Sequence, residues 1–542
     1  MRKILNMARM ALLITGMSCF MSAFALASDF GKVEIKNNWF YVDGEKFFVK
    51  GVNYEAYRPG QSPDNGDKVN LEMVDHDFTL IKEAGFNTIR TAGGMTPEIM
   101  TLAQKHGLWV MDGIWFNKDM DYADPQTLEY AMGLLKADID WTKNYDNVLC
   151  YLFINEPDME RVRSAGKEKT EEFLRKLAKG VKALDPKRQV SFANWAPLAF
   201  IDHSFLDLVG MNAYIFSPNT ISLSLGYRSY IEWLKKDVAK DKPLVITEFG
   251  LSVSKTRQGQ AQLGSYGYGG NTVAEQATAD VAMYNDLIQG GATGGCVFTW
   301  IDEWWMTGDK SVHDNVPEEY FGIVSMDEDP KGTPRDAYYA LQQFNQALVI
   351  EPKTAVYYSG ILPVEVYTTE NVIKVQYKVD DQPWQDLNKD GSLWAKGSVD
   401  ISSLPKGKHR FEVQALDHDA KVICNKSSDV LFGNASDNNP AYTVIISTDK
   451  SEYIMGDEVH FTISVTDVNG NPVAGKSLAY GLFQPIGWWE HGSKVTTDAQ
   501  GVMTKQFSPM AKGFLTISAG VVDENKDGVM KRYGDIKVIS IK

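Results

Sequence analysis

The chain has 542 residues, of which 44% are hydrophobic and 23% are charged, and its formal net charge at pH 7 is −15. This balance is that of a globular protein, and the chain is longer than one compact domain needs, so we expect two or three domains. The acidic charge argues against nucleic acid or an anionic membrane surface as a partner, and a neutral substrate fits it more easily.

The start of the chain has the pattern of an export signal. Three basic residues precede an apolar stretch that runs to about Leu26, and Ala-Leu-Ala at 25–27 is the small-x-small pattern of a signal-peptidase site. We therefore expect a signal peptide over residues 1–27, cleavage after Ala27, and a secreted or periplasmic protein. The alternative is an uncleaved membrane anchor, which the short length of the stretch disfavours. No later segment is apolar enough to span a bilayer, so no transmembrane segment is expected after signal removal.

Short apolar runs alternate with longer amphipathic segments up to about residue 348. The short runs predict eight buried strands, at residues 47–54, 87–91, 108–114, 148–157, 189–195, 208–214, 243–250 and 294–305. Helix-like segments lie between them, most clearly at residues 70–85, 96–107, 169–186, 272–291 and 335–348. Eight strand-then-helix units over about 300 residues predict an α/β fold, a (β/α)8 TIM barrel over residues 28–350. A doubly wound open sheet is the alternative, but no Gly-rich phosphate loop follows the first strand.

Helical periodicity disappears after about residue 350. Short runs rich in Val, Ile, Tyr and Thr are separated there by Asp-Gly, Asn-Gly and Pro-Lys-Gly turns, a pattern typical of β-sandwiches. We expect two all-β, Ig-like sandwich domains, over residues 351–437 and 438–542. In the second, "TDVNGNPVAGKSLAY" and "TTDAQGVMTKQF" resemble the bacterial Ig-like modules of invasins and extracellular enzymes.

Two of the apolar runs end in a carboxylate. The run "CYLFI" leads into Asn155, Glu156 and Pro157, and the run "PLVIT" leads into Glu248. Because the carboxyl ends of barrel strands meet at one rim, strands four and seven are expected to bring Glu156 and Glu248 to one cleft. Two carboxyls about 5 to 5.5 Å apart permit a retaining glycosidase, whereas a wider gap leaves room for the water used in inversion. One carboxyl must hold a proton for the leaving oxygen, and the other must be ionised to attack the anomeric carbon.

The motifs "INEP" and "ITEFG", in this strand order, resemble the retaining glycoside hydrolases of clan A, and the resemblance spans about residues 33 to 348. Within the clan the chain looks most like the catalytic barrels of families 2 and 5, with some likeness to β-glucanosyltransferases. The resemblance implies that Glu156 is the general acid/base and Glu248 the nucleophile. It also implies that Asn155 hydrogen-bonds the 2-hydroxyl of the sugar, a contact that strengthens in the transition state.

The same resemblance assigns three supporting roles. Arg90 in "NTIRT" matches the arginine that keeps the nucleophile ionised, and Tyr214 in "GMNAY" matches the tyrosine that hydrogen-bonds it. Trp300, in the eighth predicted strand, matches the tryptophan that clan members place beneath the bound sugar. A purely structural role is the alternative for Arg90 and Tyr214.

Sugar recognition needs aromatic faces for the apolar side of the ring and directional polar groups for its hydroxyls. Further aromatic candidates just beyond strand ends are Tyr54, Trp115 and Trp195, followed by Tyr57, Trp304 and Trp305. Polar candidates at comparable positions are Asp112, Asn194 and Asn212. Ordinary packing at the rim is the alternative for all of them.

Four other segments have two interpretations each. "GSYGYGG" at 264–270 is either a mobile aromatic lid or a simple connecting loop. "DLNKDG" at 386–391 and "DENKDG" at 523–528 fit the first half of a calcium loop, but Gly397 and Gly534 stand at the twelfth position, so tight turns are favoured. Trp488 and Trp489 form either a sugar-stacking face or a domain contact. We expect neither a metal site nor a cofactor.

The leading functional hypothesis is an exported retaining β-glycosidase. It would hydrolyse O-glycosidic bonds of a β-linked poly- or oligosaccharide by double displacement, so that a carbohydrate substrate is the expected partner. A transglycosylase of the β-glucanosyltransferase type uses the same two glutamates and is the first alternative. The second is a non-catalytic carbohydrate-binding or adhesion protein, which has no chemical need for Glu156, Glu248, Arg90 and Tyr214 together. The sugar, the linkage, exo or endo action and the oligomeric state are not predicted.

Overall fold

The computed structural model describes residues 30–542 except 217–225, 257–265, 355, 435–441, 485–487 and 525–529, and the side chains of 485–494 and 522–532 are not described either. The predicted signal peptide, residues 1–27, therefore lies outside the described residues. In the part of the chain that the structure describes, no helix is both long and apolar enough to cross a membrane.

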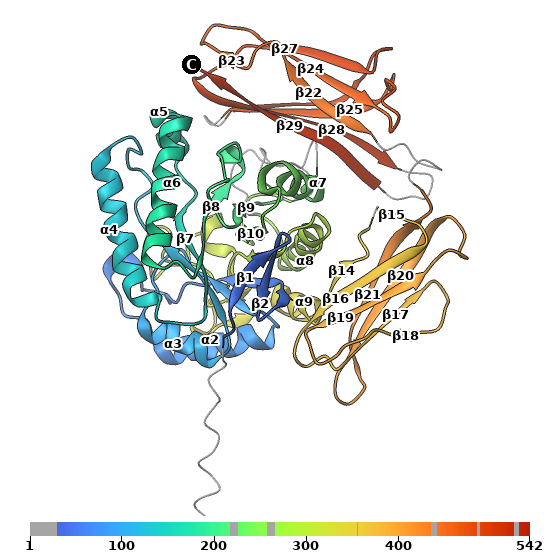
Figure 1. The fold of residues 1–542 in the computed structure, drawn as a ribbon. Helices are drawn as coiled ribbons and strands as arrows, with labels where there is room; N and C mark the ends of the chain where they lie inside the picture. Colours follow the sequence, from blue (N-terminus) through green and yellow to red (C-terminus); the bar gives the residue numbers. More distant parts are fainter. Residues whose placement is uncertain are drawn as a thin grey trace, which may run out of the picture.

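Eight parallel strands close into a barrel (Figure 1). In chain order they are β4 (Val49–Asn53), β5 (Thr88–Arg90), β6 (Trp109–Ile114), β7 (Val148–Asn155), β8 (Gln189–Trp195), β9 (Val209–Asn212), β10 (Leu244–Phe249) and β11 (Gly294–Val297). Neighbours in the barrel follow this order, and the pairing of β11 with β4 closes the sheet. Each observed strand lies within a predicted one, and the predicted TIM barrel is confirmed.

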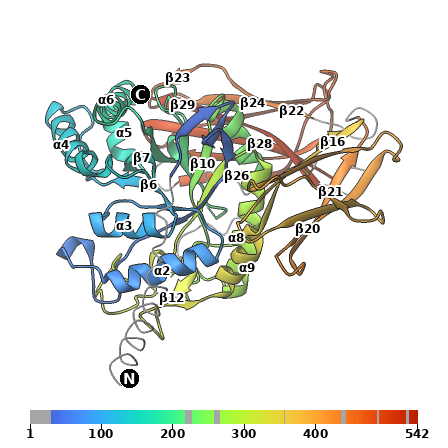
Figure 2. The ribbon, with the colours of Figure 1, turned by 60° about the horizontal axis from the view of Figure 1, so that its bottom comes forward.

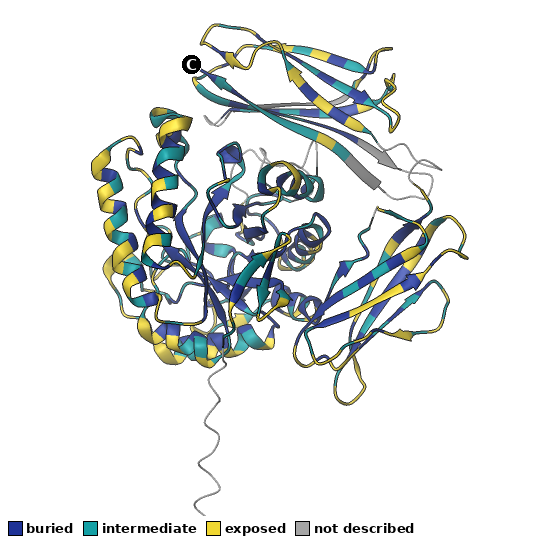
Figure 3. Cartoon of the chain, viewed as in Figure 1, coloured by how far each residue is buried: buried dark blue, intermediate teal, exposed yellow. Residues whose placement is uncertain are grey.

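Helices cover the outer face of the barrel, which is why the strands are buried on both faces. They are α2 (Leu71–Glu83), α3 (Pro97–Lys105), α4 (Pro125–Thr142), α5 (Met159–Ala165), α6 (Lys167–Leu184), α7 (Tyr227–Trp233) with the π-helical turn η3 (Leu234–Ala239), α8 (Val273–Gln289) and α9 (Asp336–Asn345). Asn70 and Thr96 cap the first two through their side chains, and Thr272 with Glu275 forms a capping box at α8. Exposed residues gather on the outward faces of α4 and α6 (Figure 3).

A small antiparallel sheet precedes the barrel. It consists of β1 (Val33–Lys36), β2 (Trp39–Val42) and β3 (Glu45–Phe47), none of which was among the predicted strands. Phe40 and Phe47 pack with Trp109, Leu149 and Val245, which lie at or near the first residues of their barrel strands. The sheet therefore closes the amino-terminal end of the barrel and leaves chemistry to the opposite end.

Two β-sandwiches follow, each of a three-stranded and a five-stranded sheet around its own apolar core. The first has β14 (Ala347–Glu351), β16 (Ile361–Thr368) and β19 (Trp394–Asp400) facing β15 (Tyr357–Tyr358), β21 (Val422–Phe432), β20 (Gly407–Leu416), β17 (Lys374–Val379) and β18 (Gln385–Asp386). The second has β22 (Thr443–Thr448), β24 (Val459–Thr466) and β27 (Val502–Phe507) facing β23 (Glu452–Tyr453), β29 (Met530–Ile541), β28 (Gly513–Glu524), β25 (Ser477–Gln484) and β26 (Trp488–Thr496).

Both sandwiches touch the barrel. The first lies beside α9, where Lys426 of β21 sits over the ring of Phe344 at 3.4 Å (Figure 2). The second lies along the side of the barrel that carries α7, and the ring centroids of Phe200 and Phe514 are 4.0 Å apart there (Figure 1). The barrel is thus supported from two sides by all-β units.

Candidate active site

Polar side chains occupy the carboxyl ends of five barrel strands. Asn53, Arg90, Asn155 and Asn212 are the last residues of β4, β5, β7 and β9, and Glu248 is the next to last residue of β10. The carboxyl ends of parallel strands in a closed barrel meet at one edge, so residues far apart in the chain come together. Hydrogen bonds join these five side chains and Glu156 into one network.

Glu248 is a buried carboxylate with two strong donors. Arg90 donates from Nη1 to Oε1 at 2.7 Å, and the hydroxyl of Tyr214 donates to Oε2 at 2.6 Å. Burial, together with the charges of Glu248 and Glu156, raises the pKa of Tyr214 well above its usual value, so the phenol keeps its proton and donates it. Both carboxyl oxygens of Glu248 are therefore held in fixed positions.

The surroundings of Glu156 favour its protonated form. Burial raises its pKa to about 7, and the negative charge of Glu248 adds to this effect, while a hydrogen bond from Asn212 and the charge of Lys118 act against it. Asn212 donates from Nδ2 to Oε1 at 2.9 Å. Among the described residues, no partner meets the other carboxyl oxygen. A substantial share of the molecules therefore carry a proton on Glu156 near neutral pH, and one oxygen of this carboxyl is available for an outside group.

The amide of Asn155 is oriented by two donors. Its Oδ1 accepts from Arg90 Nη2 at 2.8 Å and from Asn212 Nδ2 at 3.1 Å. This fixes which end of the amide carries the nitrogen, and Nδ2 has no acceptor among the described side chains and backbone. The amide nitrogen is therefore available to donate to a substrate hydroxyl.

Two asparagines have a larger part in this hydrogen-bond network than the sequence predicted. Asn212, one of several uncertain polar candidates, bridges Asn155 to Glu156 and accepts from the hydroxyl of Thr247 at 2.7 Å. Asn53, which the sequence analysis passed over, accepts from Arg90 at 2.6 Å and donates to the carbonyl of Thr247 at 3.0 Å. The available signal was the position itself, a polar residue at the last place of an apolar run.

The backbone beside the two glutamates is irregular. Ile154 has φ of +85° and Glu156 has φ of +48°, a left-handed region that side chains with a Cβ rarely adopt. The strand register also shifts between Leu152 and Asn155 in β7, and between Ile246 and Glu248 in β10. Such bulges re-aim side chains, and strained backbone of this kind gathers at functional sites.

Three more glutamates lie near the pair, and none was predicted. Glu55 follows β4, Glu303 follows β11, and Glu318 belongs to the 3-10 turn η4 (Pro317–Tyr320). Burial raises the pKa of Glu55 to about 7 and that of Glu303 well above its usual value, and the charges of Glu55, Glu318 and Glu248 also raise that of Glu303. The site is therefore rich in acidic groups.

The structure corrects the prediction for Trp300. Its side chain is fully buried and its ring packs against Tyr338 of α9, 6.0 Å between centroids, so a sugar does not reach it. β11 ends at Val297, and the half-buried aromatic that follows the strand is Phe298. The ring centroid of Phe298 lies 6.2 Å from that of Tyr214, which places Phe298 beside the acid pair.

Tyr54 is also part of the protein core. It is 2% exposed, its hydroxyl donates to Asp77 of α2 at 2.9 Å, and its ring packs on Phe78. Asp77 also forms an ion pair with Arg58 at 2.5 Å. These contacts hold the start of the loop after β4 against α2 and leave Tyr54 unavailable to substrate.

The remaining predicted aromatics differ in exposure. Trp115 follows β6 and is 59% exposed, and Trp195 ends β8 half-buried with its indole donating to the carbonyl of Pro157 at 3.3 Å. Tyr57 and Trp305 form an edge-to-face pair with centroids 6.4 Å apart. These four positions can offer an aromatic face, whereas Trp304 stacks on His313 at 4.6 Å between ring centroids.

Two polar candidates face away from the acid pair. Asp112 is fully buried, and the charge of Asp138 on α4, after burial, raises its pKa. Asn194 donates to the carbonyl of Leu198 at 2.9 Å and meets His203 Nε2 at 3.1 Å. Both residues serve packing between strands and the outer layer.

Some predictions fall partly outside the described residues. The possible lid at 264–270 is described only from Tyr266, and in it Tyr268 donates to Glu318 and packs on Phe216 with 5.2 Å between centroids. The side chains of Trp488 and Trp489 and most of the segment 523–528 lie outside the description. In the other candidate calcium segment, Asp386 pairs with Lys374 at 2.9 Å, as expected for a strand edge.

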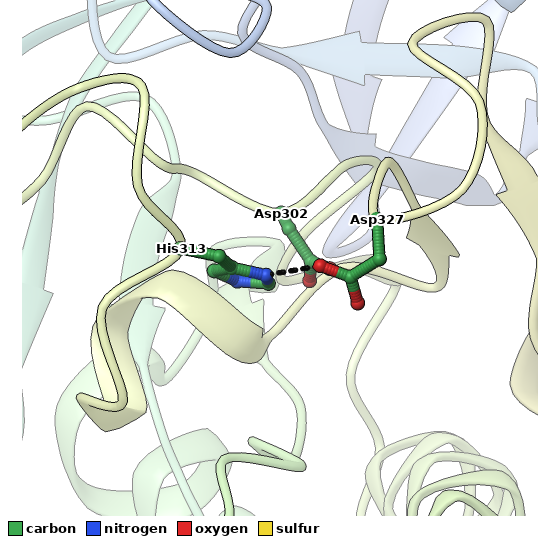
Figure 4. A group of neighbouring side chains, drawn as sticks. All are labelled: Asp302, His313 and Asp327. Atoms are coloured by element: carbon green, nitrogen blue, oxygen red, sulfur yellow. Dashed lines mark hydrogen bonds and ion pairs between the residues drawn. The ribbon is translucent and has the colours of Figure 1, made fainter.

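One group of side chains has the residue types of a metal site. Ligand atoms of Asp302, His313 and Asp327 lie within 4.8 Å of one another (Figure 4). Each of the three side chains already has a partner within the protein. Arg335 binds Asp302 in a bidentate ion pair at 2.7 and 2.6 Å, and His313 Nδ1 lies 2.6 Å from Asp327. The guanidinium of Arg335 supplies the positive charge that a metal ion would bring. We therefore interpret these side chains as a structural network that holds the loop after β11 in place.

A closed parallel barrel with a carboxyl group at the ends of its fourth and seventh strands is the arrangement of clan A glycoside hydrolases. Residues 33–266 match the family model described as "Glycosyl hydrolases family 2, TIM barrel domain". Over these residues the barrel of this chain is therefore similar to the barrels of family 2.

Curated relatives carry the names of two activities. A β-glucuronidase of Paenibacillus borealis is 24% identical over 236 residues, 40% of this chain and 37% of that protein. A β-galactosidase of Staphylococcus xylosus is 24% identical over 350 residues, 58% of this chain and 30% of that protein. The crystal structure of a Bacteroides uniformis β-glucuronidase has a TM-score of 0.45 and 14% identity, covering 93% of this chain and 66% of that one. The chain thus spans about a third of the length of the curated relatives that it matches.

Proposed function

We propose that this protein is an exported retaining β-glycosidase that cleaves O-glycosidic bonds of a β-linked poly- or oligosaccharide. The observation that carries the proposal is the contrast between two neighbouring carboxyls. Glu248 accepts from a guanidinium and a phenol, as an ionised nucleophile requires, whereas burial and the Glu248 charge raise the pKa of Glu156 to about 7. Double displacement needs one carboxyl that can give a proton and a second that is held in place to attack, and the contacts of Glu156 and Glu248 differ in this sense.

In the first step Glu248 attacks the anomeric carbon while Glu156 gives its proton to the leaving oxygen. The C–O bond to the leaving group breaks as the bond from carbon to the Glu248 carboxylate forms, and Glu156 becomes ionised. The amide nitrogen of Asn155 donates to a hydroxyl of the sugar, and this bond stabilises the charge that develops on the ring. Arg90 and Tyr214 hold the attacking carboxylate in place.

In the second step Glu156 takes a proton from an acceptor, which attacks the anomeric carbon and releases Glu248. Water as the acceptor gives hydrolysis, and a sugar hydroxyl gives transglycosylation. The same residues serve both outcomes, so the products distinguish them. We assign hydrolysis as the main reaction, in keeping with the names of the curated relatives.

An activity screen tests the proposal. The mature protein, residues 28–542, is incubated with β-linked glycans and aryl β-glycosides, alongside Glu156→Gln and Glu248→Gln, and products are identified by mass. The proposal predicts cleavage that both substitutions reduce by at least about 10³-fold, with activated aryl glycosides less affected by Glu156→Gln because their leaving groups need no proton.

Two outcomes would contradict the proposal. Full activity in Glu248→Gln would rule out this residue as the nucleophile. Glycan binding by the sandwiches, residues 351–542, together with no turnover of any glycoside by the whole protein, would favour a non-catalytic binding protein.

A further inference from the structure

A strip of aromatic and polar groups lies on the rim of the barrel beside the catalytic network. Glu55, in the loop after β4, stands two residues beyond Asn53 of the network. Ala92, in the loop after β5, stands two residues beyond Arg90, and its backbone nitrogen donates to Glu55 Oε1 at 3.3 Å. The strip therefore adjoins the side chains that hold Glu248 in place.

Gly93 and Gly94 come next in the loop after β5, and side chains from two other loops flank them. A Cβ built at Gly93 would lie 2.9 Å from the Cβ of Trp115, in the loop after β6. A Cβ built at Gly94, which is exposed, would lie 3.6 Å from Glu55 Oε2 and 3.6 Å from the hydroxyl of Tyr57. Trp115 thus lies against one glycine, and two side-chain oxygens lie beside the next.

Trp305, in the loop after β11, extends the strip beyond Tyr57. The two rings form an edge-to-face pair with centroids 6.4 Å apart. The backbone nitrogen of Gly60 donates to the carbonyl of Lys310 at 2.6 Å, which joins the loops that carry the two rings. Three loops thus bring aromatic rings to one side of the rim. We call this set the rim strip, and it consists of Glu55, Tyr57, Gly93, Gly94, Trp115 and Trp305.

The rim strip has the composition of a sugar-binding surface. Trp115 is 59% exposed, and Tyr57 and Trp305 are half-buried. Among the described residues, neither Glu55 Oε2 nor the hydroxyl of Tyr57 has a hydrogen-bond partner. An aromatic face can cover the apolar side of a sugar ring while oxygens beside it bond the hydroxyls. Core packing would instead bury the indole and pair the oxygens.

The order of the strands tells which part of a substrate would meet the rim strip. The catalytic pair divides the rim into two arcs, one with β11, β4, β5 and β6 and the other with β8 and β9. Trp195, at the end of β8, donates to the carbonyl of Pro157 and so stands beside the acid Glu156. The leaving group must lie on the side of the acid, and the rest of the glycan extends from the reacting sugar the other way. The rim strip, on the first arc beside the support of Glu248, lies in that direction.

We propose that the rim strip binds a second sugar on the glycone side, so that the enzyme cleaves within a β-linked chain instead of removing one terminal sugar. The ring of Trp115 covers the apolar face of this sugar, and Glu55 and Tyr57 bond its hydroxyls. This inference rests on the proposed glycosidase function and narrows its substrate class to chains with at least two sugars before the bond that breaks. Trp115 and Tyr57 are thereby specificity-determining residues.

A series of substrates of increasing length tests the inference. The protein is assayed with aryl β-glycosides that carry one, two or three sugars of the gluco, galacto, manno and xylo series, in the linkages of the glycans in the activity screen. We expect kcat/KM to rise at least about tenfold from one sugar to two, because binding energy from the second sugar contributes to the transition state. A one-sugar glycoside that is cleaved as efficiently as the longer ones would overturn the inference and leave the glycosidase proposal standing. No cleavage of any glycoside in the series would count against both.

Variants connect the length preference to the rim strip. Trp115→Ala should lower the ratio of kcat/KM for two sugars to kcat/KM for one sugar at least about tenfold. Tyr57→Phe removes the hydroxyl alone and should lower the same ratio by about threefold, and it serves where Trp115→Ala does not fold. Tyr130→Ala is the matched control, since Tyr130 is 49% exposed on α4, and it should leave the ratio unchanged. A merely structural role would reduce both substrates equally, so an unchanged ratio in every variant that folds would overturn the assignment.

Discussion

Glu156 and Glu248 are the same residue type in opposite surroundings. Glu248 receives a guanidinium and a phenol hydroxyl, whereas Glu156 receives one amide and the repulsion of its partner. The hydrogen bond from Asn212 favours the ionised form of Glu156 and so opposes burial. Protonation at the residue scale is thus set by a small number of named contacts.

The pH dependence of turnover should report on Glu156. Activity should fall as pH rises through about 7, because the acid loses the proton that the leaving oxygen needs. Asn212→Ala removes a donor to the carboxylate, so the alkaline limb of kcat/KM should move up by roughly half to one pH unit. Asn144→Ala, in the exposed turn after α4, is the control that should not move the limb. A limb that stays in place in Asn212→Ala would contradict this assignment.

Glu55 gives a prediction for stability. Its pKa is raised from 4.5 to about 7 on folding, so its ionisation costs stability at pH values above about 7, and the cost is absent below about 4.5. Glu55→Gln should raise the free energy of unfolding at pH 8 by an amount on the order of 1–3 kcal/mol, and the thermal midpoint should rise with it. At pH 4 neither quantity should change. Thermal unfolding of both proteins at the two pH values measures this. An equal effect at both values would show that charge is not the cause.

At the scale of elements, strand ends carry the site, and glycines allow the strands to approach. A Cβ built at Gly250, directly after β10, would lie 2.1 Å from the carbonyl oxygen of Phe298, and one at Gly113 in β6 would lie 1.9 Å from that of Thr91. Only glycine permits such backbone contacts. The spacing of β10 and β11, and with it the position of Glu248 relative to Phe298, depends on Gly250.

Gly250→Ala should therefore damage the site more than the fold elsewhere. The added methyl group must push β10 away from the segment after β11, and we expect at least about 10²-fold loss in kcat/KM together with a lowered thermal midpoint. Gly133→Ala, on the surface of α4 where an added Cβ meets nothing within 4 Å, is the matched control and should be stable and active. Wild-type activity in Gly250→Ala would contradict the proposed dependence.

The sequence predicted the strands well and the side chains beyond them less well. Strands buried on both faces are continuous apolar runs, which is why all eight were found, and the carboxylates that end two of them stood out. Trp300 was misplaced because the apolar run from residue 294 to 305 continues past the true end of β11 at Val297. Asn53, Glu303 and Glu318 were missed because their roles depend on contacts across the barrel. Such contacts join residues far apart in the chain and produce no periodic pattern in the sequence.

At the scale of the whole molecule, the two sandwiches contact the barrel on its sides. The aromatic contact between Phe200 and Phe514 joins the second sandwich to the barrel, and Trp394 of the first donates to the carbonyl of Lys46 at 2.7 Å beside the amino-terminal sheet. These contacts suit a supporting role, and their place in the molecule is away from the Glu156 and Glu248 network.

Loosening the second sandwich should reduce stability without changing the chemistry. Phe514→Ala removes an aromatic ring from the contact and should lower the free energy of unfolding by an amount on the order of 1–3 kcal/mol. The thermal midpoint should fall with it, and kcat should stay unchanged. Met510→Ala, exposed on the same sandwich, is the control. A large fall in kcat for Phe514→Ala at a temperature where it stays folded would show that the sandwich takes part in the reaction.

The central claim is that Glu248 forms a covalent bond to the sugar, and trapping that bond tests it most directly. A 2-deoxy-2-fluoro β-glycosyl fluoride, in the configuration that the activity screen identifies, forms the intermediate quickly and releases it slowly, and peptide mass mapping then locates the label. The account predicts one sugar per chain, attached to Glu248, and no label in Glu248→Gln. A label on any other residue, or normal turnover without a trapped intermediate, would contradict the account.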